Sequence, residues 1–321
     1  MANKKYDVIT SGYVSMDRIV KLLSPVQVGF TSLIENKTSA DIQYGGCSVN
    51  ISYNLCKVGV NSMPIMRVGD DYEEIGFKKF LEDAGISLEA TTVIPGERTS
   101  LCYLLQDNQG QHMTLFYPGA MDGSLAQPLA DDIFENVRLG VMTVGSRADN
   151  EIFFEMCKKH DIPLVFSMKG DMDAFPRDFL DELLHYSSII FTNEVERETI
   201  EGIFGESMTA LLGTGRCSLL ITTLGGDGSK CYYKENGKVE EVFVPLCPND
   251  GLVDTTGCGD AFVSGFLYGY LNRKTPRQCA MLGTVLSSYI LEKEGCCTGA
   301  PTEEMLLARY AKFEETLKGE N

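Results

Sequence analysis

The chain has 321 residues, of which 44% are hydrophobic and 23% are charged, close to the averages of globular proteins. This length suits one large α/β domain with a smaller appendage, or two modest domains. With 28 basic residues against 45 acidic ones, the formal net charge of -17 repels nucleic-acid backbones and anionic membranes, so neither is expected as a partner.

The N-terminal segment passes directly into a short apolar run, Tyr6 to Thr10, without the apolar core or cleavage site of a signal peptide. No stretch of about 18 apolar residues, the length of a membrane span, occurs elsewhere. The 11 cysteines are scattered through apolar segments without disulfide-framework or zinc spacing, which favours a reduced interior. The sequence therefore predicts a soluble, cytoplasmic protein.

Short apolar runs alternate with segments of helical periodicity along most of the chain. The expected strands, each with the helix after it, are Tyr6–Thr10 with Ser48–Val58, Pro64–Val68 with Glu73–Ala84, Val141–Val144 with Glu151–His160, Pro163–Phe166 with Phe179–His185, and Ile189–Thr192 with Val195–Phe204. A further strand is expected at Leu219–Thr223. This repetition favours a mostly parallel sheet covered by helices on both faces, with the ligand outside the carboxyl ends of the strands.

Two regions interrupt the alternation, residues 14–44 and residues 91–118. In the second, Thr99–Gln106 and His112–Tyr117 are typical of two strands joined by a short turn. We expect both regions to form a small antiparallel sheet, a lid over the strand ends that excludes water. The whole chain, residues 1–321, is then one domain with this lid inserted in it.

A glycine segment, Gly45 to Asn50, precedes the first expected helix. Gly45 and Gly46 let the backbone approach a ligand closely, and Asn50 can offer both a donor and an acceptor to adjacent hydroxyls. Alone, such a segment is more often a turn than a site.

The most informative segment is Asp254-Thr-Thr-Gly-Cys-Gly-Asp260, which runs into an apolar pattern of helical period. Gly257 and Gly259 leave backbone amides free to point at an anion in front of the helix, and Asp260 can accept the proton of an attacking hydroxyl. The plainer interpretation is a tight turn followed by a helix that Asp260 caps.

Together the two segments resemble the two signatures of the ribokinase/PfkB family, although Ser48 stands where Gly, Ala or Pro is usual and Cys258 where Ala or Gly is usual. The resemblance implies a ribokinase-like, three-layer α/β/α fold, doubly wound around a mostly parallel sheet with a small antiparallel β lid. It also implies a kinase that uses ATP and Mg²⁺ to phosphorylate a hydroxyl of a sugar or nucleoside. No Walker sequence with its phosphate-binding lysine occurs.

The resemblance also assigns roles to single residues. Asp260 is the catalytic base, and the backbone of Thr256, Gly257, Cys258 and Gly259 forms the anion hole. The acceptor is bound by Asp17, Gly45, Gly46 and Asn50, and the nucleotide by Asn193, Thr223, Gly225, Gly228 and Thr256, while Glu196 helps to place Mg²⁺ through water. Plainer interpretations are an exposed loop for Asp17, a helix cap for Asn193 to Glu196, and a hairpin turn for Thr223 to Gly228.

These signatures indicate the reaction rather than the acceptor. Residues 50–55, 108–109 and 116–121 are similar to the branch that includes bacterial and archaeal adenosine kinases, and Phe116 could stack on a nucleobase. Adenosine or another nucleoside therefore competes with a free sugar. A non-catalytic nucleotide-binding regulator is the alternative of another class, and Asp260 argues against it.

The C-terminal part is expected to be helical from Thr275, with a break at Gly295 to Pro301 and a charged helix to Lys318. The resemblance places the adenine or a monovalent cation beside this break. It also implies that two copies can pair as a homodimer through the lid.

Overall fold

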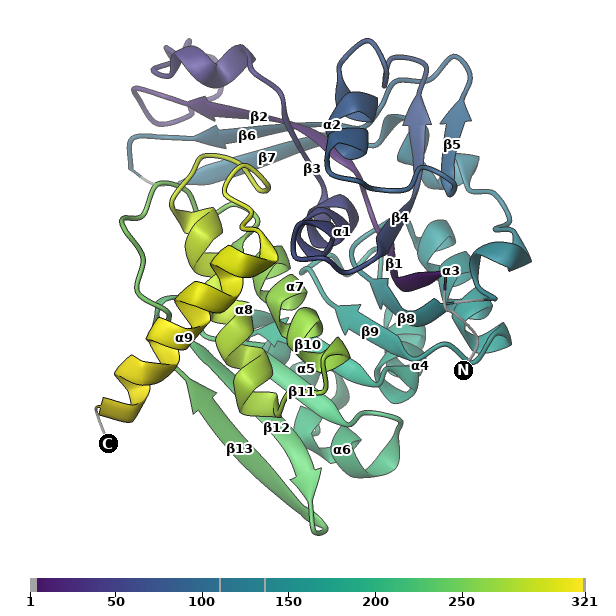
Figure 1. Ribbon diagram of the computed structural model, residues 1–321. Coiled ribbons are helices and arrows are strands. Elements are labelled where there is room, and N and C mark those ends of the chain that lie inside the picture. The colour runs from purple at the N-terminus through teal and green to yellow at the C-terminus, as the bar shows by residue number, and fades with distance from the viewer. Residues whose placement is uncertain (1–4, 110, 136, 320–321) are drawn as a thin grey trace.

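The computed structural model describes residues 5–109, 111–135 and 137–319 of the chain. These residues form a nine-stranded sheet and a separate four-stranded sheet (Figure 1). In spatial order the strands of the large sheet are β13 (Lys238–Val244), β12 (Ser229–Glu235), β11 (Leu219–Thr223), β10 (Ile189–Asn193), β9 (Leu164–Ser167), β8 (Val137–Met142), β1 (Tyr6–Ser11), β4 (Ser62–Gly69) and β5 (Thr91–Ile94).

The large sheet is parallel from β11 to β5, and only β12 and β13 run antiparallel at one edge. The chain first moves from β1 outward through β4 to β5, then returns to β8 on the other side of β1 and moves outward again. The order therefore reverses between β1 and β8. In doubly wound sheets the ligand crevice lies at such a switch point, outside the carboxyl ends of the strands.

Helices cover both faces of the large sheet, as the alternating sequence pattern predicted. The helices are α1 (Cys47–Lys57), α2 (Phe77–Asp83), α3 (Arg147–Lys159), α4 (Arg177–Tyr186), α5 (Glu194–Phe204), α6 (Leu211–Thr214), α7 (Cys258–Leu271), α8 (Pro276–Leu291) and α9 (Glu303–Gly319). Short 3₁₀ turns lie at Lys37–Ala40, Gly119–Met121, Gly123–Leu125, Asp131–Ile133, Met208–Ala210 and Gly225–Asp227. Side chains of α1, α7, α8 and α9 join one core cluster, and side chains of α3 to α6 join the other.

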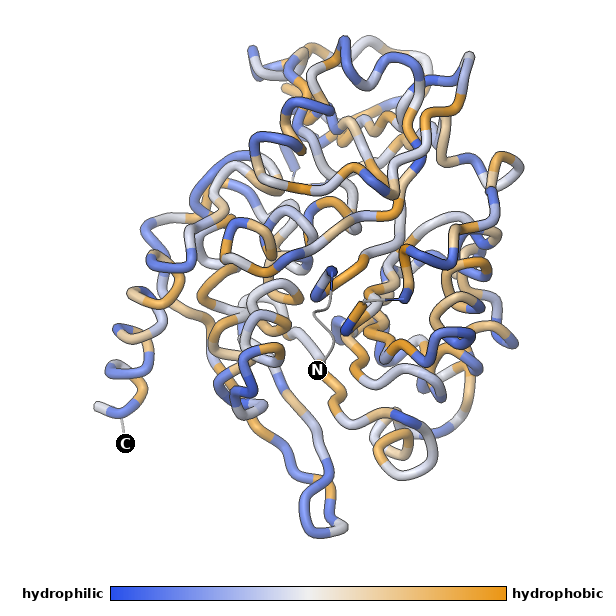
Figure 2. The backbone as a smooth tube through the Cα atoms, turned by 45° about the vertical axis from the view of Figure 1, so that its right-hand side comes forward, coloured by the Kyte–Doolittle hydropathy of each residue, from blue (hydrophilic) through white to orange (hydrophobic). Residues whose placement is uncertain are grey.

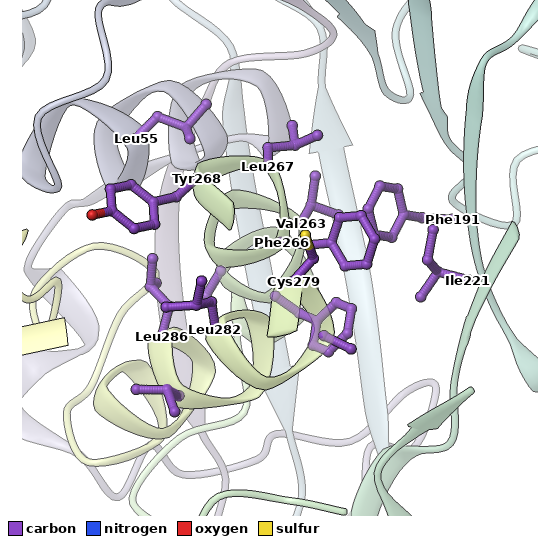
Figure 3. Packing of buried hydrophobic residues seen from close by; sticks show 14 of the residues in the cluster. Leu55, Phe191, Ile221, Val263, Phe266, Leu267, Tyr268, Cys279, Leu282 and Leu286 are labelled. Carbon is purple, nitrogen blue, oxygen red and sulfur yellow. The ribbon is translucent and has the colours of Figure 1, made fainter. Parts of the chain in front are cut away.

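Successive residues of the central strands point to opposite faces of the sheet, both of which are covered, so these strands are apolar over most of their length. In β10, Ile189 and Phe191 enter the cluster under α7 and α8, whereas Ile190 enters the cluster on the other face. Figure 3 shows Phe191 and Ile221 packed against Val263 and Phe266 of α7.

Glycines hold α7 close to α8. A Cβ at Gly265 would lie 2.3 Å from the carbonyl oxygen of Leu282, and a Cβ at Gly283 would lie 2.9 Å from that of Phe262. Only residues without a side chain allow the two backbones to approach this closely. The N-terminus of α7 is therefore fixed by tight helix packing along its length.

The smaller sheet has the order β3 (Gln43–Gly45), β2 (Ser15–Lys21), β6 (Leu101–Gln106) and β7 (His112–Tyr117). In it β2 and β6 run parallel, while the other two pairs are antiparallel. It lies apart from the large sheet, beyond α1 (Figure 1). Thr91–Ile94, which falls in the expected lid region, instead pairs with β4 at the edge of the large sheet.

Capping residues and glycines explain where helix boundaries differ from the expected ones. α3 begins four residues before Glu151, because the side chain of Ser146 accepts a hydrogen bond from the amide of Asp149. α2 begins only at Phe77, after Gly76 in a left-handed conformation.

The projecting β12–β13 hairpin has a hydrophilic tip (Figure 2). Within the described residues, no helix has the length and apolar character needed to cross a membrane.

Candidate active site

The second glycine segment forms the N-terminus of α7. Gly257 precedes the helix with φ of +79°, a left-handed conformation that glycine adopts without strain. A Cβ at Gly257 would also lie 2.8 Å from the Cα of Cys296, so a neighbouring loop leaves no room for a side chain. The amides of Thr256 and Cys258 already donate, to the carboxylate of Asp254 and to the carbonyl of Thr255, so the amides of Gly259 and Asp260 are the ones in front of which an anion can bind. We call this region, Thr256 to Asp260, the cradle.

Asp260 lies in the first turn of α7 with only 2% of its surface exposed. Its Oδ2 accepts a hydrogen bond from Nδ2 of Asn50 at 2.9 Å, and its Oδ1 lies 3.1 Å from Nζ of Lys169. A buried carboxylate needs such partners, because burial without them is strongly unfavourable. The two glycine segments, distant in sequence, thus meet at one carboxylate.

The first glycine segment brings Asp17 and Asn50 together. A Cβ at Gly45 would lie 3.0 Å from Oδ1 of Asn50 and 3.5 Å from Oδ2 of Asp17. Gly46 has φ of +92°, and a Cβ there would lie 2.3 Å from the carbonyl oxygen of Tyr13. Packing against the protein backbone therefore requires a glycine at position 46, and two polar side chains flank Gly45; the expected close approach of a ligand to both glycines stays a prediction.

Asp17 is not in an exposed loop after the first strand but lies within β2 of the lid, with 7% of its surface exposed. The hydroxyl of Ser15 donates a hydrogen bond to its Oδ1. Burial raises the pKa of Asp17 to about 6, with Asp260 adding to the rise and the Ser15 hydrogen bond opposing it. The structure rejects the exposed-loop interpretation and places Asp17 within the region 14–44 that was expected to form the small sheet.

Asn193 and Glu196 lie where β10 ends and α5 begins. The amide of Glu196 donates to Oδ1 of Asn193, and the amide of Asn193 donates to Oε2 of Glu196, both at 2.8 Å. This is the capping box that the sequence allowed as the plainer interpretation. The two residues also line a cavity of about 80 Å³, together with Lys169, Thr223 and Gly259.

The segment from Thr223 to Gly228 is a hairpin turn between β11 and β12, closed by the hydrogen bond from the amide of Leu224 to the carbonyl of Gly228. Thr223 lines the same cavity as Asn193. Gly225 is exposed, and Gly228 packs against the carbonyl of Val244. The structure thus brings Thr223 to the cavity, whereas the two glycines lie in the turn beyond it.

A larger cavity of about 360 Å³ separates the lid from the loop before α7. Its lining comprises Ile19, Lys21, Leu104, Leu105, Gln106, Leu252, Val253, Asp254, Thr255, Thr256 and Glu294. Phe116 lies on the lid face that carries Asp17, because Cys102 pairs with both of them across neighbouring strands. The ring of Phe116 contacts that of Tyr13, with centroids 4.8 Å apart.

The sequence from residue 7 to residue 303 matches the family described as pfkB family carbohydrate kinase. The chain belongs to the pfkB family of carbohydrate kinases. As a pfkB-family kinase, it is an ATP-dependent phosphotransferase that acts on a hydroxyl group, as the sequence predicted.

Individual relatives of this pfkB-family chain differ in their acceptors. The nucleoside kinase of Methanocaldococcus jannaschii is 26% identical to this chain, over 85% of this chain and 87% of the relative. The superposition on its crystal structure has a TM-score of 0.85 and covers 97% of this chain and 100% of the relative. The ATP-dependent 6-phosphofructokinase of Thermoanaerobacterium thermosaccharolyticum is 27% identical, over 96% and 95% of the two chains. A Burkholderia thailandensis nucleoside kinase in complex with inosine shares the fold, with a TM-score of 0.82, 21% identity, and 95% and 98% of the chains covered.

The loop between α8 and α9 closes one side of the candidate site. The carboxylate of Asp254 accepts hydrogen bonds from the amide of Thr256 at 2.9 Å and from the amide of Gly295 at 3.0 Å. Cys296 packs against Gly257, and the thiol of Cys297 donates to Oδ1 of Asn50 at 3.5 Å. The expected break between the two C-terminal helices therefore supports the cradle directly.

Two features of the site could not be inferred from the sequence motifs. One is Lys169, which follows β9 and reaches Asp260; its only sequence signal is a lysine just beyond an apolar strand. The other is the approach of Cys296 and Cys297, from the loop between α8 and α9, to Gly257 and Asn50. Burial raises the pKa of Cys47 and of Cys258 to about 12 in each case, so both stay protonated and weakly reactive.

Asp17 gives the site an expected pH dependence. Because its pKa is raised to about 6, the carboxyl takes up a proton as the pH falls through this value and loses acceptor capacity. We expect kcat/KM for the acceptor to fall below a midpoint of about pH 6, since this parameter reports ionisations of the free enzyme. A pH profile of kcat/KM for wild type and Asp17→Asn measures this. A midpoint near the ordinary value of about 4 would contradict it.

Proposed function

We propose that this chain transfers the γ-phosphoryl group of ATP to a hydroxyl of a sugar or nucleoside, with Asp260 as the general base. The observation that carries the proposal is the position of Asp260. It lies at the N-terminus of α7, beside the cradle amides, and contacts Asn50 of the first glycine segment and Lys169. A base and an anion-binding site side by side are the parts that phosphoryl transfer needs.

In this proposal the acceptor hydroxyl lies between Asp17, Asn50 and Asp260. Its oxygen attacks the γ-phosphorus, its proton passes to Asp260, and the bond from phosphorus to the bridging oxygen breaks, so that the electron pair leaves with ADP. The cradle amides stabilise the charge on the transferring group. Asn193 and Thr223 lie on the nucleotide side, with Gly225 and Gly228 in the adjoining turn. The buried base and its contacts make a non-catalytic regulator the weaker alternative.

The residues around the smaller cavity fit a water-held magnesium ion. Among the described side chains, no group of three or more His, Cys, Asp and Glu residues is arranged to hold a metal. Mg²⁺ in kinases usually keeps several waters and is held by one or two carboxylates and by substrate phosphates, so a single carboxylate suffices. Glu196 supplies it, and the bound ion would neutralise phosphate charge. A monovalent cation beside the loop at Thr298 to Pro301 stays a prediction.

Glu196→Gln is expected to raise the magnesium concentration needed for half-maximal activity by about ten- to a hundredfold, with a smaller change in acceptor KM. Glutamine can keep the capping box, so the helix start should persist while the charge is lost. Magnesium titrations of initial rate measure the effect. Glu194→Gln is the matched control, because Glu194 is exposed in the same first turn. Full activity of wild type in excess chelator would remove the metal from the proposal.

We also propose that the acceptor is a nucleoside, adenosine among the first to test. The larger cavity beneath the lid combines apolar residues such as Ile19, Leu104 and Leu252 with polar ones. Outside its lining, Phe116 adds aromatic surface on the sheet face that carries Asp17, in contact with the ring of Tyr13. Asp17 and Asn50 would bind vicinal hydroxyls of either a sugar or a nucleoside. Both M. jannaschii and B. thailandensis relatives are named nucleoside kinases, which supports the same choice.

Phe116→Ala is expected to raise KM for a nucleoside about ten- to a hundredfold and to spare any activity on a free sugar, because stacking on a base is worth roughly 1–3 kcal/mol. Tyr117→Ala is the matched control, since Tyr117 is the next residue of β7 and points to the opposite face of the lid. Steady-state kinetics with both acceptor classes measure the effect. Equal losses on sugar and nucleoside would show that Phe116 only packs the lid.

We propose further that residues 1–321 act as one kinase domain, with residues 14–44 and 91–118 serving as its lid, apart from the edge strand β5 (Thr91–Ile94). The placement of β2, β3, β6 and β7 in one small sheet supports this.

A homodimer through the lid is also proposed. Tyr103, Met113 and Leu115 are exposed on the sheet face opposite Asp17, and a second copy would cover them. Sedimentation velocity would detect the dimer.

The test of the proposed function is ADP formation by purified protein with ATP and Mg²⁺ across a panel of sugars and nucleosides. The proposal predicts acceptor-dependent ADP formation, greatest with a nucleoside. Turnover on sugars alone would reject the nucleoside, and no acceptor-dependent turnover on any member would reject the kinase reaction with these acceptor classes.

A further inference from the structure

Lys169 occupies a distinctive place in the site. It follows β9, at the carboxyl ends of the parallel strands, and its Nζ lies 3.1 Å from Oδ1 of Asp260. A Cβ at Gly259 would lie 3.5 Å from the same Nζ, so the ammonium group is directly above the cradle. It also lines the cavity that contains Glu196 and Asn193. Lys169 therefore lies where the proposed base Asp260, the cradle and the cavity lined by Asn193 and Glu196 meet.

The chemistry of the site calls for a cation at this junction. Transfer of a γ-phosphoryl group spreads negative charge over its oxygens, and the surrounding side chains Asp260 and Glu196 are themselves acidic. The sequence lacks a Walker lysine, and Lys169 is the one cationic side chain among the described residues that line the cavity. The carboxylate of Asp260 raises the pKa of Lys169, so the ammonium form is kept.

We propose that Lys169 is the phosphoryl-binding cation of this site, donating to an oxygen of the γ-phosphoryl group of ATP while it remains paired with Asp260. This inference rests on the proposed function and names a catalytic residue within it. An ammonium group carries three N–H donors, so one can face Asp260 and others can face the phosphoryl oxygens. The contact would also bring the transferring group close to the base that receives the acceptor proton.

The solvent exposure of the Lys169 side chain fits a phosphoryl-binding role better than the role of a counter-ion to Asp260 alone. The side chain of Asp260 is 4% exposed, whereas that of Lys169 is 35% exposed. Lys169 therefore reaches its buried partner from the cavity and retains an open side toward it. A purely structural partner of Asp260 would affect ATP and ADP binding alike, because both nucleotides share every group except the γ-phosphoryl. The difference between the two affinities is thus the decisive observable.

The experiment measures MgATP and MgADP binding by isothermal titration calorimetry without any acceptor, and kcat with the best acceptor. Lys169→Met is expected to weaken ATP binding about tenfold or more relative to ADP binding, as charge-assisted hydrogen bonds are worth about 1.5–3 kcal/mol. Lys169→Arg should restore part of this difference. Lys158→Met is the matched control, because Lys158 has the same 35% side-chain exposure and pairs with Glu155 on α3.

Removing Lys169 leaves the buried Asp260 unpaired, so the comparison is repeated in the Asp260→Asn background, where neither charge remains. The inference predicts the same selective loss of ATP affinity there. Equal changes for ATP and ADP, or no change in either, would overturn it. If wild type phosphorylates an acceptor but Lys169→Met keeps the ATP-to-ADP affinity ratio, the inference alone fails. If wild type binds neither nucleotide, the proposed function fails and the inference with it.

Discussion

Asp260→Asn is expected to lower kcat by about 10²- to 10⁴-fold, the usual contribution of general-base catalysis, while ATP still binds. Asparagine has nearly the same shape, and its side-chain oxygen can still accept the hydrogen bond that Asn50 now donates at 2.9 Å. It cannot take the proton of the attacking hydroxyl. The change therefore removes the base with little change in the shape of the site, and the loss should appear in kcat more than in KM.

The measurement is kcat on the best acceptor together with ATP affinity by calorimetry. Asp250→Asn is a suitable control, because Asp250 is an exposed aspartate in the loop that leads to the cradle. Its kinetic parameters should match those of wild type. Turnover of Asp260→Asn within about threefold of wild type would show that another group accepts the proton.

Gly257→Ala is expected to lower kcat by about 10²- to 10³-fold, the cost of losing one oxyanion-hole donor. A Cβ at this position would lie 2.8 Å from both Cα and Cβ of Cys296, so the cradle or the loop must move. Alanine also resists the left-handed φ of +79°. A shift of even a fraction of an ångström turns the cradle amides away from the transferring group, and the rate should fall more than ATP affinity does.

The matched control is Gly205→Ala. Gly205 ends α5 with φ of +71°, and a Cβ there would meet nothing within 4 Å. Both variants share a left-handed penalty of roughly 1–2 kcal/mol, to which the clash with Cys296 adds in Gly257→Ala, but only Gly257→Ala should lose activity. Thermal unfolding of both variants measures the stability lost to backbone strain. Their kcat values measure whether the cradle amides have moved. Equal activity of the two variants would show that the cradle does not depend on Gly257.

Much of the large sheet could be predicted because its strands are apolar on both faces. The run Leu219–Thr223 coincides with β11, and Ile189–Thr192 falls one residue short of β10. The strand β5 (Thr91–Ile94) escaped this pattern, since two of its four residues are exposed at the sheet edge. The cradle was also accessible from sequence, because its glycines, its helix and Asp260 are contiguous.

The remainder of the site depends on contacts between distant segments. Lys169 approaches Asp260 only because β9 ends beside the N-terminus of α7, and no local pattern encodes that distance. Asp17 lies in the region where the small sheet was expected, but no local pattern indicates that its side chain is buried beside Gly45. In the same way, Cys296 and Cys297 gave no indication that their loop packs against Gly257 and Asn50.

The central claim is that the γ-phosphoryl group of ATP moves directly to an acceptor hydroxyl in this site. The most direct measurement follows ATP labelled in its γ-phosphoryl group and recovers the label after incubation with Mg²⁺ and the best acceptor of the panel. We predict that the label appears in the phosphorylated acceptor, at a rate reduced by Asp260→Asn. Label recovered only as inorganic phosphate, or transferred at the same rate by Asp260→Asn, would contradict the account.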